Sequence, residues 1–169
     1  MNLLSEGNKR IKRLCNRLGI PLKTRLVAQI IYSRVFSTSQ HDHEFLSLCC
    51  INLACKIIDT YFDENLIFNT NKINYKEIKE IEKYICNKIN HNFNIFPIHF
   101  IYIKFAKILN KGLHYNTLTV LDEIHEDDRI LKIKYFENEN KMFCGGDVAL
   151  SLFKDSEVSF LVDKMGMFH

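Results

Sequence analysis

The sequence is poor in residues that interrupt helices: its 169 residues include six glycines, two prolines and no tryptophan. This scarcity argues against a loop-rich β-sandwich or a disordered linker, and it favours long helices. The longest apolar stretch, residues 45–58, is interrupted by Ser47, Asn52 and Lys56 and is too short to span a bilayer. Residues 1–7 lack the charged, apolar and cleavable regions of a signal peptide.

Patterns for disulfide frameworks and metal sites are also missing. None of the six cysteines forms a C-x-x-C pair, and His41 and His43 lack the further ligands that a metal needs. With 47% hydrophobic residues, the chain has enough apolar side chains for a core without disulfide bonds. We therefore expect buried thiols in a reducing, intracellular compartment, nuclear or cytoplasmic, with no metal and no cofactor.

Motifs of catalysis are absent from the sequence as well. There is no nucleophile elbow and no H-E-x-x-H pattern, and Gly145-Gly146 lacks the rest of a phosphate-binding loop. The net charge of +3 is too small to indicate a polyanion-binding protein by itself. The sequence thus predicts a binding or regulatory protein rather than an enzyme.

Hydrophobic periodicity predicts an all-α fold with five consecutive main helices. Their predicted ranges are residues 8–18, 22–36, 43–61, 74–89 and 97–109. The pattern weakens after residue 110: residues 117–128 have a helical pattern, 130–141 a mixed pattern that suits an extended segment, and 147–153 and 158–162 short helical ones. We therefore divide the chain into a helical domain at 1–110 and a truncated or degenerate region at 111–169.

The third predicted helix, residues 43–61, follows a predicted N-cap, Asp42, and is apolar almost all round, as is typical of a helix surrounded by others. Its exceptions form one narrow polar stripe because they follow each other at helical spacing. The stripe consists of Asn52, Lys56, Asp59 and Thr60.

The fourth predicted helix begins with a capping box. Asn74 is the predicted N-cap, Glu77 follows three residues later, and Ile73 is placed to pack on Ile78. At 100° per residue, Glu82 lies in the middle of the apolar face, while Lys79 and the other charges of this helix project elsewhere. A carboxylate there needs a cationic partner, and Lys56 is the obvious candidate.

Three stretches in this order resemble the cyclin box. They are residues 31–36 (I-Y-S-R-V-F), residues 50–59 (C-I-N-L-A-C-K-I-I-D), and the passage from Glu82 through Ile89 to Phe93-Asn94-Ile95 and Pro97. The resemblance covers about residues 8 to 110. It is nearest the transcription and RNA-processing cyclins of the C, H, K, L and T kinds, and it leaves a cell-cycle role open.

The resemblance implies a five-helix cyclin box with a short, degenerate second cyclin-like portion. It also implies a regulatory subunit that forms a heterodimer with a cyclin-dependent protein kinase and activates it. In cyclins the matching Lys and Glu pair and face the kinase's activation helix. The kinase-binding residues carried over in this way are Lys56 and Glu82 at the centre, with Ile57, Asp59, Cys86, Phe93 and Ile95 around them.

The sequence also departs from the family pattern. The family's M-R-A-I-L docking motif and its Trp are absent, which argues against cell-cycle-type substrate recruitment. Between Ile89 and Phe93 the sequence has two more residues than the family pattern. The partner of Lys56 can therefore be either Glu82 or Glu80.

Two alternatives to the activating cyclin remain open. One is a nucleic-acid-associated factor resembling transcription factor IIB, which uses the same fold. For nucleic acid, the candidate contacts are the cations of the first helix, although a solvated helix face explains them better: Lys9, Arg10, Arg13 and Arg17. The other is a cyclin-box scaffold that activates no kinase.

Overall fold

A computed structural model describes residues 3–61, 63, 65–68, 74–113, 115–126, 136–138 and 141–143. The described part is mostly helical, as the sequence predicts. The chain divides into two compact units, Met1–Ile95 and Phe96–His169. The predicted helices at 147–153 and 158–162, and the predicted turn at Gly145-Gly146, lie outside the described residues.

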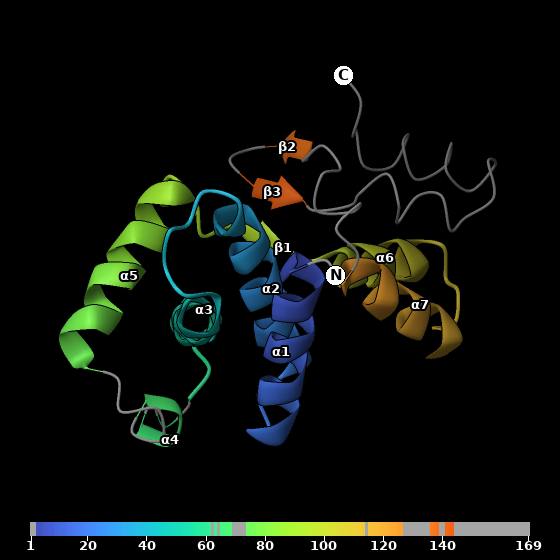
Figure 1. Cartoon of the computed structure of the whole chain (residues 1–169). Helices are drawn as coiled ribbons and strands as arrows, with labels where there is room; N and C mark the ends of the chain where they lie inside the picture. Colours follow the sequence, from blue (N-terminus) through green and yellow to red (C-terminus); the bar gives the residue numbers. More distant parts are fainter. Residues whose placement is uncertain are drawn as a thin grey trace. The chain divides into compact units, whose positions relative to one another are not determined.

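The first unit is a group of helices around α3. Its members are α1 (Leu3–Arg17), α2 (Leu22–Phe36), α3 (His43–Ile58), the short α4 (Asn65–Phe68) and α5 (Tyr75–Lys88). Helix α3 packs against α1, α2 and α5, and Figure 1 shows it between α5 and the pair formed by α1 and α2. Every residue from Leu46 to Cys55 is buried, which confirms the prediction of a surrounded third helix.

Helix α1 begins at Leu3, earlier than the predicted residue 8, because its first turns also bury a face. Leu4, Gly7 and Asn8 are buried there. Gly7 lies directly against the buried ring of Tyr32 in α2: a Cβ atom at Gly7 would be 2.2 Å from the Tyr32 hydroxyl oxygen. The missing side chain therefore allows the two helices to approach closely.

Helices α1, α3, α5 and α6 (Ile98–Ile108) end in the same way, with a left-handed residue just beyond the last turn. These residues are Gly19, Asp59, Asn90 and Asn110, with φ of 66°, 54°, 53° and 52°, and after α5 a second one follows, His91, with φ of 54°. After α3, the Thr60 amide donates to the Cys55 carbonyl (2.8 Å) and the Asp59 amide to the Lys56 carbonyl (3.4 Å), the pattern of a Schellman motif. Helix α3 thus ends at Ile58, short of the predicted residue 61.

Both predicted N-caps are confirmed. The Asp42 carboxylate accepts hydrogen bonds from the amides of Glu44 and Phe45, each at 3.0 Å. The Asn74 side-chain oxygen accepts one from the Lys76 amide at 3.1 Å. Ile73, the other half of the predicted staple, lies outside the described residues. Short polar side chains at these positions satisfy amides that have no partner within the helix.

The second unit contains α6 and α7 (Tyr115–Glu126), which pack together. Their shared core is apolar: Ile98, Ile101, Tyr102, Phe105 and Leu121. Strands β2 (Phe136–Asn138) and β3 (Lys141–Phe143) pair antiparallel, with Phe136 opposite Phe143, within and just after the segment predicted to suit an extended chain.

The two units divide after Ile95, inside the two-residue strand β1 (Ile95–Phe96). The fifth predicted helix, observed as α6, therefore belongs to the second unit. The predicted boundary after residue 110 separates a cyclin box from a degenerate region, and that functional division stays a prediction.

The contact between Gly7 and Tyr32 predicts that Gly7→Ala destabilises the first unit. The new methyl group must displace a fully buried ring, so we expect a loss of about 1–3 kcal/mol in the free energy of unfolding. Chemical denaturation followed by circular dichroism measures it. Gly112→Ala is the matched control, because nothing lies within 4 Å of a Cβ atom there; an equal loss in both variants would contradict the close approach of α1 and α2.

The buried thiols predict a loss of stability at alkaline pH. Burial raises the pKa of Cys15 and of Cys49 from 9.0 to about 12. An unfolded chain ionises these thiols above pH 9, whereas the folded chain keeps them protonated. Ionisation therefore stabilises the unfolded state, by up to about 1.4 kcal/mol per pH unit for each thiol between pH 9 and about 12. Stability should be unaffected by these thiols below pH 9 and fall from there toward pH 12.

Urea unfolding midpoints at several pH values test this expectation. The double variant Cys15→Ala, Cys49→Ala should show a shallower alkaline decline than the wild type, although its cavities lower stability at every pH. Parallel alkaline slopes for the two proteins would contradict the raised pKa values.

Candidate functional site

A buried carboxylate joins α3 to α5. Glu82 Oε1 lies 2.6 Å from Lys56 Nζ and accepts a second hydrogen bond from Asn52 Nδ2 at 2.7 Å. This confirms that Lys56 pairs with Glu82; Glu80 is exposed and is not the partner. Asn52 and Lys56 stand one helical turn apart on α3, so both donors of the predicted polar stripe reach the same oxygen.

The network includes a third donor that the sequence analysis did not assign. Lys79 projects away from the apolar face, as predicted, and its Nζ lies 3.5 Å from Glu82 Oε2, across the i, i+3 spacing on α5. That spacing was the signal available in the sequence. The pKa of Lys79 is raised, first by its interaction with the Tyr75 side chain and then by the charge of Glu82.

Exposure differs sharply within the network. The Glu82 side chain is 10% exposed, whereas those of Lys56 and Lys79 are 38% and 49% exposed. The carboxylate is therefore held inside, and the two ammonium groups lie partly at the surface. Lys56 is also in the last turn of α3, where the helix dipole favours a positive charge.

The other predicted contact residues are spread around this network. Ile57 and Cys86 are half-buried. Asp59 is exposed and ends α3 in a left-handed conformation. Phe93 is 39% exposed, with its ring centroid 6.2 Å from that of His91, while Ile95 is 5% exposed and presents little side-chain surface. Their role in binding a kinase stays a prediction.

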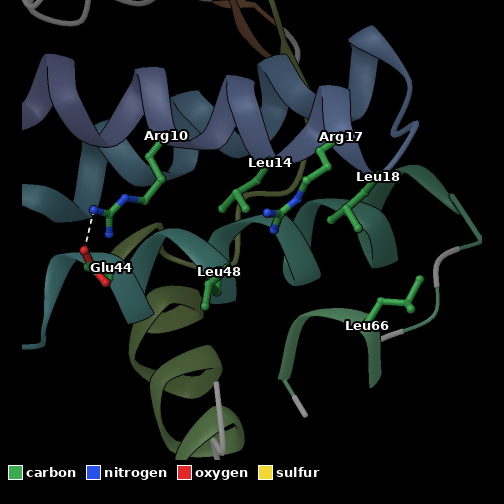
Figure 2. Close-up of a pocket in the computed structure, with 7 residues that line it drawn as sticks. All are labelled: Arg10, Leu14, Arg17, Leu18, Glu44, Leu48 and Leu66. Atoms are coloured by element: carbon green, nitrogen blue, oxygen red, sulfur yellow. Dashed lines mark hydrogen bonds and ion pairs between the residues drawn. The ribbon is translucent and has the colours of Figure 1, made fainter. Parts of the chain in front are cut away.

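A second feature of the first unit lies between α1 and α3. A groove of about 640 Å³ is lined by residues of α1, α3 and α4 and by Leu18, which follows α1. Figure 2 draws the lining residues: Arg10, Leu14, Arg17, Leu18, Glu44, Leu48 and Leu66. We call it the α1–α3 groove. A hollow of about 260 Å³ shares Arg10, Leu14 and Arg17 with it and adds Arg13.

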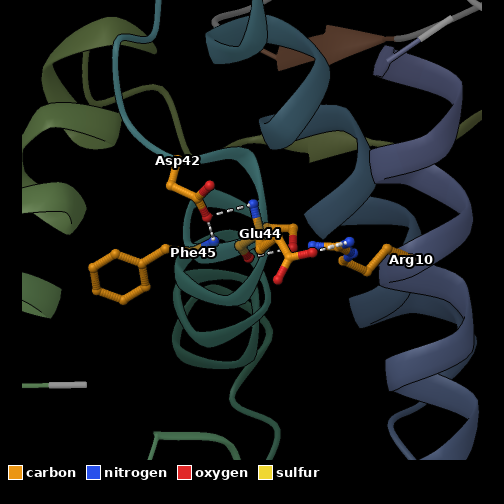
Figure 3. A network of polar contacts seen from close by, with 5 residues as sticks. Arg10, Asp42, Glu44 and Phe45 are labelled. Atoms are coloured by element: carbon orange, nitrogen blue, oxygen red, sulfur yellow. Dashed lines mark hydrogen bonds and ion pairs between the residues drawn. The ribbon is translucent and has the colours of Figure 1, made fainter. Parts of the chain in front are cut away.

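The predicted nucleic-acid contacts on α1 are in three different situations. Arg10 is paired with Glu44, which stands in the first turn of α3 because Asp42 caps that helix (Figure 3). Arg13 and Arg17 are exposed, and no carboxylate among the described residues pairs with either. Lys9 is exposed and lines neither hollow. No signal in the sequence indicated the contact between Arg10 and Glu44.

Two further properties of the described residues bear on the site. In this part of the chain, no three His, Cys, Asp or Glu side chains come together as metal ligands. None of its helices has the length and apolar character needed to cross a membrane.

Comparisons with known proteins return nothing. No family model, no curated protein and no solved structure matches the chain. The functional argument therefore rests on the residues and their geometry.

The geometry predicts that Lys56 and Glu82 are energetically coupled. A double-mutant cycle with Lys56→Ala and Glu82→Gln should give a coupling of about 1 kcal/mol in the free energy of unfolding. Solvent screening at the 38% exposed Lys56 keeps it below the ~3–5 kcal/mol lost when a fully buried pair is broken.

The same cycle with Lys79→Ala is the matched control. Lys79 is more exposed and its contact is longer, 3.5 Å, so we expect a coupling close to zero. Equal coupling for both lysines would contradict the primary role of Lys56.

Proposed function

We propose that the chain is a cyclin-like regulatory subunit that binds and activates a cyclin-dependent protein kinase, in transcription or RNA processing. The observation that carries this proposal is the anchored Lys56, because the resemblance to cyclins assigns the same Lys and Glu to the kinase contact. Glu82 fixes the lysine between α3 and α5, and its ammonium group remains partly at the surface.

An anchored cation of this kind suits recognition of a helix end. The position of Lys56 is fixed before binding, so little side-chain entropy remains to be lost. An ammonium group is a hydrogen-bond donor, which suits the carbonyl groups that are left unpaired at a helix C-terminus. Half-buried Ile57 and Cys86 supply apolar surface beside it. An interface of ordinary size would bury about 1,200–2,000 Å² in total.

In this proposal the kinase carries out the chemistry and the chain acts through differential affinity. It binds the kinase more tightly when the activation helix is turned inward, where the kinase's own Lys–Glu pair and metal-binding Asp are aligned. The chain itself is then not an enzyme and needs neither a metal nor a cofactor.

Two other functions are compatible with the same helices. The exposed Arg13 and Arg17 favour a nucleic-acid-associated factor resembling transcription factor IIB. A scaffold that binds partners without activating a kinase requires only the fold. Among the three, only the activating cyclin gives Lys56 a functional role.

Co-expression with each cyclin-dependent kinase of the source organism tests the proposal. We expect one kinase to copurify with the wild-type chain and to gain phosphorylation activity. Lys56→Ala should reduce both copurification and activity by about tenfold or more, since the anchored donor is lost. Lys83→Ala removes an exposed lysine from the same helix as Glu82 and should change neither.

Thermal unfolding of each variant, with assays run below the lowest midpoint, separates loss of contact from loss of fold. A folded wild-type chain that binds none of the kinases would refute the proposal. Kinase activation that Lys56→Ala leaves intact would refute the role given to Lys56.

A further inference from the structure

The α1–α3 groove combines an apolar floor with a surplus of positive charge. Leu14 of α1 and Leu18, just after that helix, line it together with Leu48 of α3, and Leu66 of α4, 58% exposed, closes one side (Figure 2). Leu66 is a large, exposed apolar side chain in this lining, and apolar side chains gathered around a groove are a common mark of a binding site.

The charges of the groove are unbalanced. Among the described residues, three guanidinium groups line it and the adjoining hollow, those of Arg10, Arg13 and Arg17, against one carboxylate, that of Glu44. Glu44 pairs with Arg10, and in the described part of the chain no carboxylate pairs with Arg13 or Arg17. The unmatched charges of Arg13 and Arg17 lie along α1. Both residues are within two helical turns of Arg10, which is a distance of about 10 Å along the helix axis.

We propose that the α1–α3 groove binds an acidic, amphipathic segment of a partner protein. Such a segment places apolar side chains at i, i+3, i+4 and i+7 on the leucines, and carboxylates beside Arg13 and Arg17. The charge complementarity selects this occupant: a basic segment would meet two unmatched arginines, and like charges face to face are unfavourable.

Two other kinds of ligand fit the groove less well. A nucleic-acid backbone would place phosphates beside the Glu44 carboxylate and leave the leucine floor without apolar partners. A small molecule needs a site that encloses most of its surface, whereas Arg17, Glu44 and Leu66 are all exposed to solvent.

The groove uses a different face of α3 from the Lys56–Glu82 network. It lies between α3 and α1, while the network joins α3 to α5. A partner in the groove therefore leaves Lys56 accessible, and this inference does not depend on the proposed kinase contact.

Fluorescence anisotropy with two synthetic peptides tests the proposal on the full chain. Both peptides form an amphipathic helix with a leucine face; one carries glutamates beside that face and the other carries lysines in their place. We expect the glutamate peptide to bind at least about tenfold more tightly than the lysine peptide. Failure of the glutamate peptide to bind, or equal binding of both, would overturn the proposal.

Variants of exposed residues locate the binding site. Arg17→Glu should weaken binding of the glutamate peptide by about tenfold or more, and Leu66→Ser by about fivefold. Lys104→Glu makes the same charge change at an exposed position of α6 and should have little effect. Equal weakening by Arg17→Glu and Lys104→Glu would show general charge attraction and overturn the site.

Competition with a labelled nucleic-acid duplex completes the test. A duplex that displaces the peptide, binds more tightly and loses affinity in Arg17→Glu would replace the peptide site with a nucleic-acid surface. A duplex that leaves the peptide bound supports the proposal.

Discussion

The buried carboxylate of Glu82 constrains the first unit more than any other single group. An ionised side chain that is only 10% exposed needs donors, and Asn52 and Lys56 provide the two shortest contacts, 2.7 and 2.6 Å. Both donors come from α3. Glu82 therefore reaches them only when α5 has one position along α3 and one rotation about its own axis. A buried ion pair adds little net stability, and its main consequence here is a fixed geometry between two helices.

The helix ends work together with this constraint. Asp42 begins α3 and the left-handed Asp59 ends it, so Lys56 falls in the last turn, where its ammonium emerges at the surface. Beyond that turn the polar stripe changes role: the Thr60 hydroxyl is 2.7 Å from that of Thr24 in α2. The residues of the predicted stripe therefore have three different roles. Asn52 and Lys56 belong to the ion network, Asp59 ends the helix, and Thr60 contacts α2.

Helix α3 presents different chemistry to its neighbours on either side. Toward α5 it offers the donors that hold Glu82, and toward α1 it offers Glu44 and Leu48 to the groove. The proposed kinase contact and the proposed peptide groove use these two faces and draw on different residues. Under both proposals, a catalytic partner and a second protein would bind at the same time, since neither occupant covers the other's residues.

The sequence by itself determined what depends on neighbours along the chain: α2 over residues 22–36, the caps Asp42 and Asn74, the buried character of α3, and Lys56 as the partner of either Glu82 or Glu80. Helical periodicity and capping are local, so they are legible without a structure. Only the tertiary structure decided the contacts between elements. It extended α1 to Leu3 through the fit of Gly7 on Tyr32, and it brought Glu44 beside Arg10 to line a groove. Those contacts depend on how separate helices approach each other, which no spacing within one helix specifies.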